Sequence, residues 1–329
     1  MSSINDVAKL AGVSTATVSR VLNDTGQCSP RTQQKVIAAV KELNYQPNIL
    51  ARSLAKASSD NVGLMVNSYR GSFFAALVSQ LQESFENQNK FLLTCRASSS
   101  RESELQAISR LKSMSCAALV LHSRALTDED LLQLAEDKVH FALIDRFVPG
   151  LEDRCVTFKH RKSARLAVEH LYKKGHRKIA CLSGTMERHS ARERYAGYAE
   201  AVEEFELEDI HIGYGHYNQD GGYKAAEKLF SRRSDVTAIF TCSEQMCVGA
   251  YEYFHHAGLR VPDDISVVSI DSVDVCQILS PKVTTVTFPI EDMAIETQEL
   301  VCRMMDGKPA IKPAVFTPNI KIFHSVKTL

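Results

Sequence analysis

The sequence predicts two domains, a small all-α domain at the N-terminus and a larger α/β body made of two lobes. Apolar residues recur at helical spacing throughout the first 57 residues. From Asn61 onward, short apolar runs alternate with amphipathic segments, a pattern typical of parallel sheets flanked by helices. About 270 residues is long for one such sheet. We therefore expect two parallel sheets, and we place the domains at residues 1–57 and 58–329.

Composition and charge restrict the class of protein. The chain is 44% hydrophobic and 24% charged, as in ordinary soluble globular proteins. The net charge is zero, but residues 1–57 carry seven Lys or Arg against three Asp or Glu. A basic domain on a mildly acidic body fits a nucleic-acid binder. With no signal peptide and no apolar run near the ~20 residues of a membrane helix, we expect a cytoplasmic protein without a membrane partner.

Residues 4–23 have the pattern of two short helices joined by a tight turn. Ser3 can cap the first helix with Asp6 three residues on, Gly12 can end it, and Ser14 can cap the second. Such a pair is either a helix-turn-helix, whose second helix enters the DNA major groove, or an ordinary helical hairpin. The outward side chains between Ser14 and Asn23 are small, hydroxylated or basic, and none is acidic. These side chains suit phosphates and base edges and favour the helix-turn-helix.

A third helix and a short, weak one complete the first domain. Ser29 and Pro30 are typical of the cap and first residue of a helix, which an apolar stripe continues to Leu43. Residues 48–57 are good helix formers, but a lone helix of that length is marginal in water. We expect it to be ordered only when something packs against it.

The body is expected to alternate strands and helices. The predicted strands are residues 62–66, 91–94, 117–121, 141–144, 155–158, 179–182, 238–241, 265–270, 285–288, 314–316 and 320–323. The predicted helices are residues 73–85, 104–114, 128–135, 162–174, 192–205, 222–230, 245–257 and 293–305. The last segments are expected to return to lobes already built.

Motifs for catalysis and metal binding are missing from the sequence. It has no phosphate-binding loop of the GxxxxGK[ST] type, no GxGxxG, no HExxH and no GxSxG. Nine cysteines lie without CxxC spacing, which predicts reduced thiols. We predict no enzyme activity, no cofactor and no metal. The alternatives are a sugar-processing enzyme or a transport-type binding protein on the same lobes, but the latter would need an export signal and the former a nucleophile or an acid–base pair.

The segment IND-VAKLAGVSTATVSRVLN, followed by YQPNILARSLA, closely resembles the DNA-binding head of the lactose/galactose repressor family of bacterial transcription regulators. The body resembles the family's effector domain, which is similar to periplasmic sugar-binding proteins, in segments such as LYKKGHRKIACLSG, RYAGY and VPDDISVVSIDSV. The resemblance covers essentially the whole chain and is greatest to the galactose and β-glucoside repressors.

The resemblance implies which residues contact DNA. Base readers of the family fall on Thr15, Ala16 and Arg20, and its phosphate contacts on Thr17, Ser19 and Asn23. The helix that begins at Asn48 corresponds to a hinge helix, and Leu54 to a wedge inserted in the minor groove. Such a helix would fold when the dimer and DNA are both present.

The resemblance also implies an effector site in the cleft between the lobes. The matching positions are Phe74, Arg146, Arg188, Ser190, Arg194 and Asp271. The chain departs from its relatives at Lys159-His160, where they have Asp or Asn, and at Ser243-Glu244, where they have Asn-Asp. We include Lys159 and Ser243 among the expected effector-binding residues.

The function implied is a repressor of carbohydrate-utilisation genes that binds a pseudo-palindromic operator in double-stranded DNA as a homodimer, under control of a small-molecule effector. The chain has no leucine-heptad tail, so a dimer is expected, not a tetramer. Lys159, Arg124 and the cleft arginines favour a sugar acid or sugar phosphate over a neutral sugar. Two alternatives stay open: nearby Glu187, Glu193 and Glu244 neutralise the arginines, or the cleft binds nothing.

Overall fold

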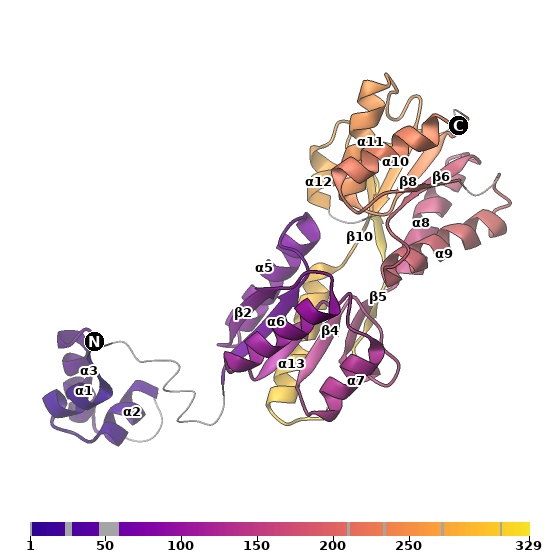
Figure 1. The fold of residues 1–329 in the computed structure, drawn as a ribbon. Helices are drawn as coiled ribbons and strands as arrows, with labels where there is room; N and C mark the ends of the chain where they lie inside the picture. Colours follow the sequence, from indigo (N-terminus) through magenta and orange to yellow (C-terminus); the bar gives the residue numbers. More distant parts are fainter. Residues whose placement is uncertain are drawn as a thin grey trace. The chain divides into compact units, whose positions relative to one another are not determined.

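A computed structural model describes residues 2–23, 28–45, 59–208, 211–232, 235–270, 273–309 and 311–329 of the chain (Figure 1). The chain separates into two units, Met1–Ser59 and Asp60–Leu329. The predicted helix of residues 48–57 lies outside the described residues.

The N-terminal unit contains three helices, α1 (Ile4–Ala11), α2 (Thr15–Asn23) and α3 (Pro30–Glu42). The predicted caps are present, since Ser3 and Asp6 form a reciprocal capping box and Ser29 accepts from Thr32 ahead of Pro30. Gly12 ends α1 in the left-handed conformation with a φ of 66°. The helices meet around a small apolar core formed by Val7, Ala8, Ala11, Val18, Val36 and Ala39.

The first lobe of the body contains a six-stranded parallel sheet in the order β11-β5-β4-β3-β1-β2. Its strands are β1 (Asn61–Val66), β2 (Phe91–Arg96), β3 (Ala118–Leu121), β4 (Phe141–Ile144), β5 (Cys155–Phe158) and β11 (Val315–Phe316). The helices α5 (Ser72–Glu86), α6 (Arg101–Ser113), α7 (Asp128–Glu136) and α13 (Ile290–Met305) and the short 3-10 turn η1 (Glu152–Arg154) belong to this lobe.

The second lobe contains a sheet in the order β12-β10-β9-β8-β6-β7, parallel except for the β10–β12 pair. Its strands are β6 (Ile179–Ser183), β7 (His211–Tyr214), β8 (Ala238–Thr241), β9 (Ser266–Ile270), β10 (Thr284–Thr287) and β12 (Asn319–Lys321). Its helices are α8 (His160–Lys173), α9 (His189–Glu204), α10 (Gln219–Phe230), α11 (Glu244–His256) and α12 (Val273–Ile278).

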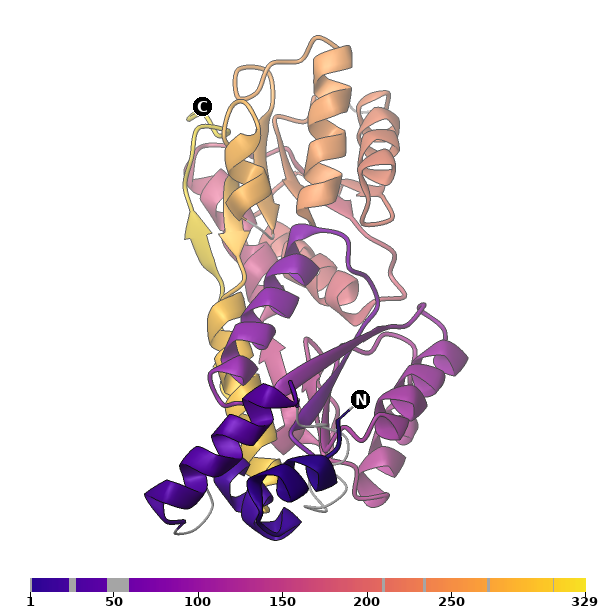
Figure 2. The same ribbon diagram turned by 90° about the vertical axis from the view of Figure 1, so that its left-hand side faces the viewer.

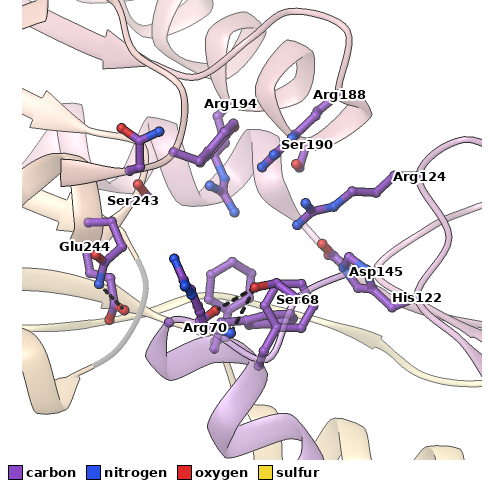
Figure 3. Close-up of a pocket in the computed structure, with 17 residues that line it drawn as sticks. Ser68, Arg70, His122, Arg124, Asp145, Arg188, Ser190, Arg194, Ser243 and Glu244 are labelled. Carbon is purple, nitrogen blue, oxygen red and sulfur yellow. Dashed lines mark hydrogen bonds between the residues drawn. The ribbon is translucent and has the colours of Figure 1, made fainter. Parts of the chain in front are cut away.

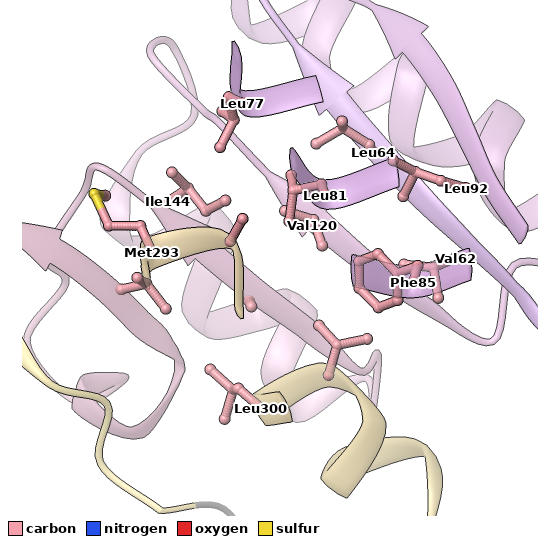
Figure 4. Close-up of a cluster of buried hydrophobic side chains, with 14 of the residues drawn as sticks. Val62, Leu64, Leu77, Leu81, Phe85, Leu92, Val120, Ile144, Met293 and Leu300 are labelled. Atoms are coloured by element: carbon pink, nitrogen blue, oxygen red, sulfur yellow. The ribbon is translucent and has the colours of Figure 1, made fainter. Parts of the chain in front are cut away.

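The described chain passes between the lobes after β5, after β10 and between β11 and β12 (Figures 1 and 2). After the second crossing α13 returns to the first lobe, as the sequence predicts. Met293 and Leu300 of α13 enter the same core as Leu81 and Phe85 of α5 and Val120 of β3 (Figure 4). This core is completed by a helix that lies more than 130 residues beyond β5 in the sequence.

Two elements of the second lobe were not predicted from the sequence, and a third begins earlier than predicted. The strand β7 was not expected, because HIGY is a short edge segment with only alternate residues buried. Helix α12 was not expected either, since it spans only six residues. The predicted helix of residues 192–205 begins earlier, at His189. In α9 a Cβ at Gly197 would lie 2.1 Å from the carbonyl oxygen of Arg161, so this glycine permits the close packing of α9 on α8.

Other chemistry of the described residues is limited. None of the nine cysteines forms a disulfide, and five of them are buried. The described residues contain no group of three or more His, Cys, Asp or Glu side chains that could hold a metal ion. Among the described helices, none has the length and apolarity needed to cross a membrane.

Candidate functional site

The N-terminal unit presents one side of α2 to solvent. Thr15, Ala16 and Arg20 are exposed, while Val18 on the opposite side is fully buried in the three-helix core. Thr17 lies at the end of this surface, where its N–H donates to Ser14 Oγ at 3.2 Å. Packing therefore holds the expected base-reading residues outward on one short helix.

The body contains a cavity of about 410 Å³ between its two lobes (Figure 3). Its walls come from the segments that follow the carboxyl ends of β1, β3, β4, β6, β7, β8 and β10. In open α/β sheets this is the edge at which ligands bind. The lining residues are Ser68, Arg70, Gly71, Phe73, Phe74, His122, Arg124, Asp145, Arg188, Ser190, Arg194, Tyr217, Asn218, Ser243, Glu244, Gln245 and Phe288.

Two arginines face this cavity from opposite lobes. Arg124 follows β3, and its guanidinium lies 5.4 Å from the centre of the Phe74 ring. Arg188 immediately precedes α9, and its guanidinium lies 4.4 Å from the centre of the Tyr217 ring. Burial, followed by repulsion from Arg188, lowers the pKa of Arg124 to about 10. The cavity therefore disfavours the positive charges that line it.

A buried chain of hydrogen bonds joins the lobes beside the cavity. Arg194, only 5% exposed, donates from Nε to His160 Nδ1 at 3.3 Å and from a terminal nitrogen to the Cys242 carbonyl. Because Nδ1 faces the Arg194 donor, His160 contacts Asp145 Oδ1 through Nε2, at 2.7 Å. Burial opposes ionisation of Asp145, but His160, His122 and Arg194 bring the pKa of its carboxyl to about 2.

A buried carboxylate, Glu104 of α6, holds the loop that carries Arg124. Its two oxygens accept from the backbone N–H groups of Arg124, Ala125 and Leu126 and from the Ser123 hydroxyl, at 2.6–3.2 Å. Glu104 also accepts from Asn67 Nδ2 at 2.8 Å. Because the Asn67 amide nitrogen is used as a donor, Asn67 Oδ1 accepts from His122 Nδ1 at 3.0 Å.

Glu244 connects the lobes on another side of the cavity. It is 2% exposed, and its Oε1 accepts from the backbone N–H of Ser72 in the first turn of α5 at 3.1 Å. A carboxylate near a helix N-terminus is electrostatically favourable. Its second oxygen, Oε2, is buried and has no hydrogen-bond partner among the described residues.

The structure brings together most of the effector-site residues expected from the sequence. Phe74, Arg188, Ser190, Arg194 and Ser243 line the cavity, with Ser243 also capping α11 through a hydrogen bond from the Met246 N–H. The strand-end rule predicts further lining positions that the sequence analysis did not select: Arg70, His122, Asp145, Tyr217 and Phe288.

Three expected residues are not in this cavity as the structure describes it. Arg146 lies in an adjoining hollow, where it pairs with Asp128 at 2.6 Å and donates to the Leu126 carbonyl. Lys159 is exposed at the start of α8 and borders a separate surface hollow, because His160, one residue later, takes the inward position. Asp271 lies outside the described residues, as do Asn48 and Leu54 and the side chain of Asn23.

These features define a regulator with a small helix-turn-helix domain and a ligand-binding body. Residues 3–48 match the bacterial regulatory proteins of the lacI family, and residues 168–324 match the periplasmic binding protein-like domain. The chain is 35% identical to the HTH-type transcriptional regulator GalR of Escherichia coli K12 over 331 residues, which cover all of this chain and 96% of GalR. It is 32% identical to the ribose operon repressor of Halalkalibacterium halodurans, covering 94% of this chain and 92% of that repressor.

Solved structures agree with these sequence matches. The lac repressor dimer bound to operator and the anti-inducer ONPF superposes with a TM-score of 0.90 at 26% identity, covering 99% of both chains. The chain therefore belongs to the LacI family of bacterial regulatory proteins, and it is a DNA-binding transcriptional regulator.

Proposed function

We propose that this chain is a repressor of carbohydrate-utilisation genes whose affinity for DNA is controlled by a small molecule held in the cavity between the lobes. The observation that carries the proposal is that two hydrogen bonds link the lobes at this cavity, one between Asp145 and His160 and one between Glu244 and the Ser72 N–H, with Arg194 bonded to His160 within the second lobe. A ligand that alters these bonds changes the relative stability of two lobe arrangements.

The proposed DNA contacts are those that the family resemblance implies. Thr15, Ala16 and Arg20 would read bases, and Thr17, Ser19 and Asn23 would hold phosphates. Residues 48–57 would form the hinge helix, with Leu54 entering the minor groove. Two heads in a homodimer require an approximately palindromic operator.

Regulation is favoured over catalysis by how the cavity's acidic groups are used. Asp145 is bonded to His160 and Glu244 to the Ser72 N–H, so neither described carboxylate is paired with a nucleophile. The relatives named above are a transcriptional regulator and operon repressors. We propose that the protein acts in the cytoplasm on chromosomal operator DNA.

Selection of bound sequences from random duplex DNA by the full chain tests this proposal. We expect the enriched sequences to share a near-palindrome with two half-sites, and we expect a ligand of the cavity to change affinity for that sequence. Enrichment without any shared sequence would contradict the proposal.

A further inference from the structure

We propose that the ligand of the inter-lobe cavity is an anionic sugar derivative, a sugar acid or a sugar phosphate. This inference rests on the proposed function, because it names the chemical class of the effector for the same cavity. It is carried by the charges, ion pairs and hydrogen bonds of the residues that line the cavity.

Positive charge exceeds negative charge in the described cavity. Arg70, Arg124, Arg188 and Arg194 line it, against the carboxylates of Asp145 and Glu244. Figure 3 shows the four arginine side chains converging on one space from both lobes. Asp145 accepts a hydrogen bond from His160 and Glu244 accepts one from the Ser72 N–H, and among the described residues neither carboxylate forms an ion pair with these arginines.

None of the four, Arg70, Arg124, Arg188 and Arg194, forms an ion pair in the part of the chain that the structure describes. The contrast is Arg146, one residue beyond Asp145, which pairs with Asp128 at 2.6 Å just outside the cavity. Arg124 and Arg188 instead lie over the aromatic rings of Phe74 and Tyr217. Arg70 is exposed, but the guanidinium groups of Arg124 and Arg188 are partly buried. Partly buried guanidinium groups without a carboxylate are costly, and an anion that accepts their hydrogen bonds removes that cost.

One helix end adds to the positive potential. Helix α9 begins at the cavity and has no side-chain hydrogen bond at its cap residue, Arg188, whereas the N-terminus of α5 is already compensated by Glu244. The first N–H groups of a helix carry partial positive charge and bind anions. The end of α9 therefore reinforces the preference set by the arginines.

The opposite wall explains why the anion is expected to carry hydroxyl groups. Figure 3 shows Glu244 across the cavity from Arg124. Glu244 Oε2 is buried without a partner among the described residues, so it lacks a hydrogen-bond donor. A sugar hydroxyl can supply that donor, while Ser190, Ser243 and Asn218 offer further polar contacts. A volume of about 410 Å³ lies toward the small end of ligand sites and suits one sugar ring.

Calorimetric titration of the full chain with D-galactose, D-galacturonate, D-galactose 6-phosphate and inorganic phosphate tests this inference. We expect galacturonate or galactose 6-phosphate to bind at least about tenfold more tightly than galactose, with an affinity that falls as salt rises. Which of the two binds better distinguishes a carboxylate from a phosphate ligand.

Variants assign the preference to the cavity. Arg124→Gln should reduce the preference for the anion at least about tenfold, whereas Lys162→Gln, an exposed cation on α8 outside the cavity, should not. The melting temperature of each variant without ligand checks that it folds, and Arg124→Gln should melt no lower than the parent chain because it removes a charge that Arg188 repels.

The outcomes separate the ligand class from the function. Galactose binding as tightly as its anionic derivatives, without salt dependence, overturns the ligand class, and so does failure of every anion, including inorganic phosphate, to bind. If galactose binds in that way and also releases DNA, the proposed function stands. An anion that binds through Arg124 but leaves affinity for the selected DNA unchanged supports the ligand class and contradicts the effector role.

Discussion

The roles of single residues in this chain depend on which of their atoms donate hydrogen bonds and which accept them. His160 shows this, because Arg194 Nε–H on one side and Asp145 on the other fix which ring nitrogen accepts and which donates. The family resemblance predicts Lys159 as an effector-binding residue and marks His160 only as a departure from relatives, but the structure places His160 inward. Adjacent residues at a strand-to-helix junction cannot be ranked from sequence alone, because the inward position depends on the last turn of backbone before α8.

Arg20 is predicted to read one base pair in each half-site. It is exposed on α2, and Arg20→Ala should cost about 1–3 kcal/mol on the selected operator and relax selectivity at one position. Lys41→Ala removes a charge from an exposed position on α3, and any weakening of binding should be equal across operator sequences. Competition among single-base operator variants measures the relative affinity for each variant. If Arg20→Ala ranks these variants in the same order as the parent chain, the result would count against base reading by Arg20.

His122 predicts how stability depends on pH. Burial, followed by repulsion from Arg124, lowers the pKa of His122 from 6.5 to about 4. Between these values the unfolded chain binds a proton that the folded chain does not, so stability falls as pH falls from 6.5 to 4. The loss attributable to His122 should be about 3 kcal/mol.

Urea unfolding at several pH values measures this dependence. His122→Gln should flatten the decline between pH 6.5 and 4, while His255→Gln on the exposed end of α11 should preserve it. An equally steep decline in both variants would show that other groups cause it.

At the scale of elements, α6 supports the cavity without reaching it. Most of its outer surface is exposed, yet Glu104 on the inner side is fully buried and accepts hydrogen bonds from the loop after β3. This role was not predicted from sequence, since an acidic residue in a helix is usually solvated and its partners are 19 to 22 residues away. The helix itself was predicted, because its apolar spacing is local.

Glu104→Gln tests this support at nearly constant volume. Both carboxylate oxygens accept, so an amide would place an N–H group against backbone donors. We expect a loss of about 2–4 kcal/mol in the free energy of unfolding, together with weaker ligand binding as the Arg124 loop loses its anchor. Glu102→Gln, exposed on the same helix, should change neither quantity. Equal stability of the two variants in urea would contradict this role for Glu104.

At the scale of the whole molecule, the sequence predicts the architecture better than the site. Alternating apolar runs predict the strands of both sheets, because a buried strand can be recognised from a short run of consecutive apolar residues. The sheet order and the return of α13 to the first lobe depend on contacts between distant segments. The cavity contains residues from seven strand ends, so its arginine cluster forms only when the carboxyl ends of strands from both sheets border the same cavity.

The three crossings have a consequence for how this molecule can be divided. Most of the second lobe, from α8 to β10, is inserted between β5 and α13 of the first lobe, and β12 joins the second lobe after β11. Residues 60–158 alone would lack α13 and leave its apolar partners on α5, β3 and β4 uncovered. We expect that fragment to aggregate, and we expect co-expression with residues 160–329 to restore a soluble complementing pair, detectable by size-exclusion chromatography. A folded, monomeric 60–158 fragment would show that α13 is dispensable to its core.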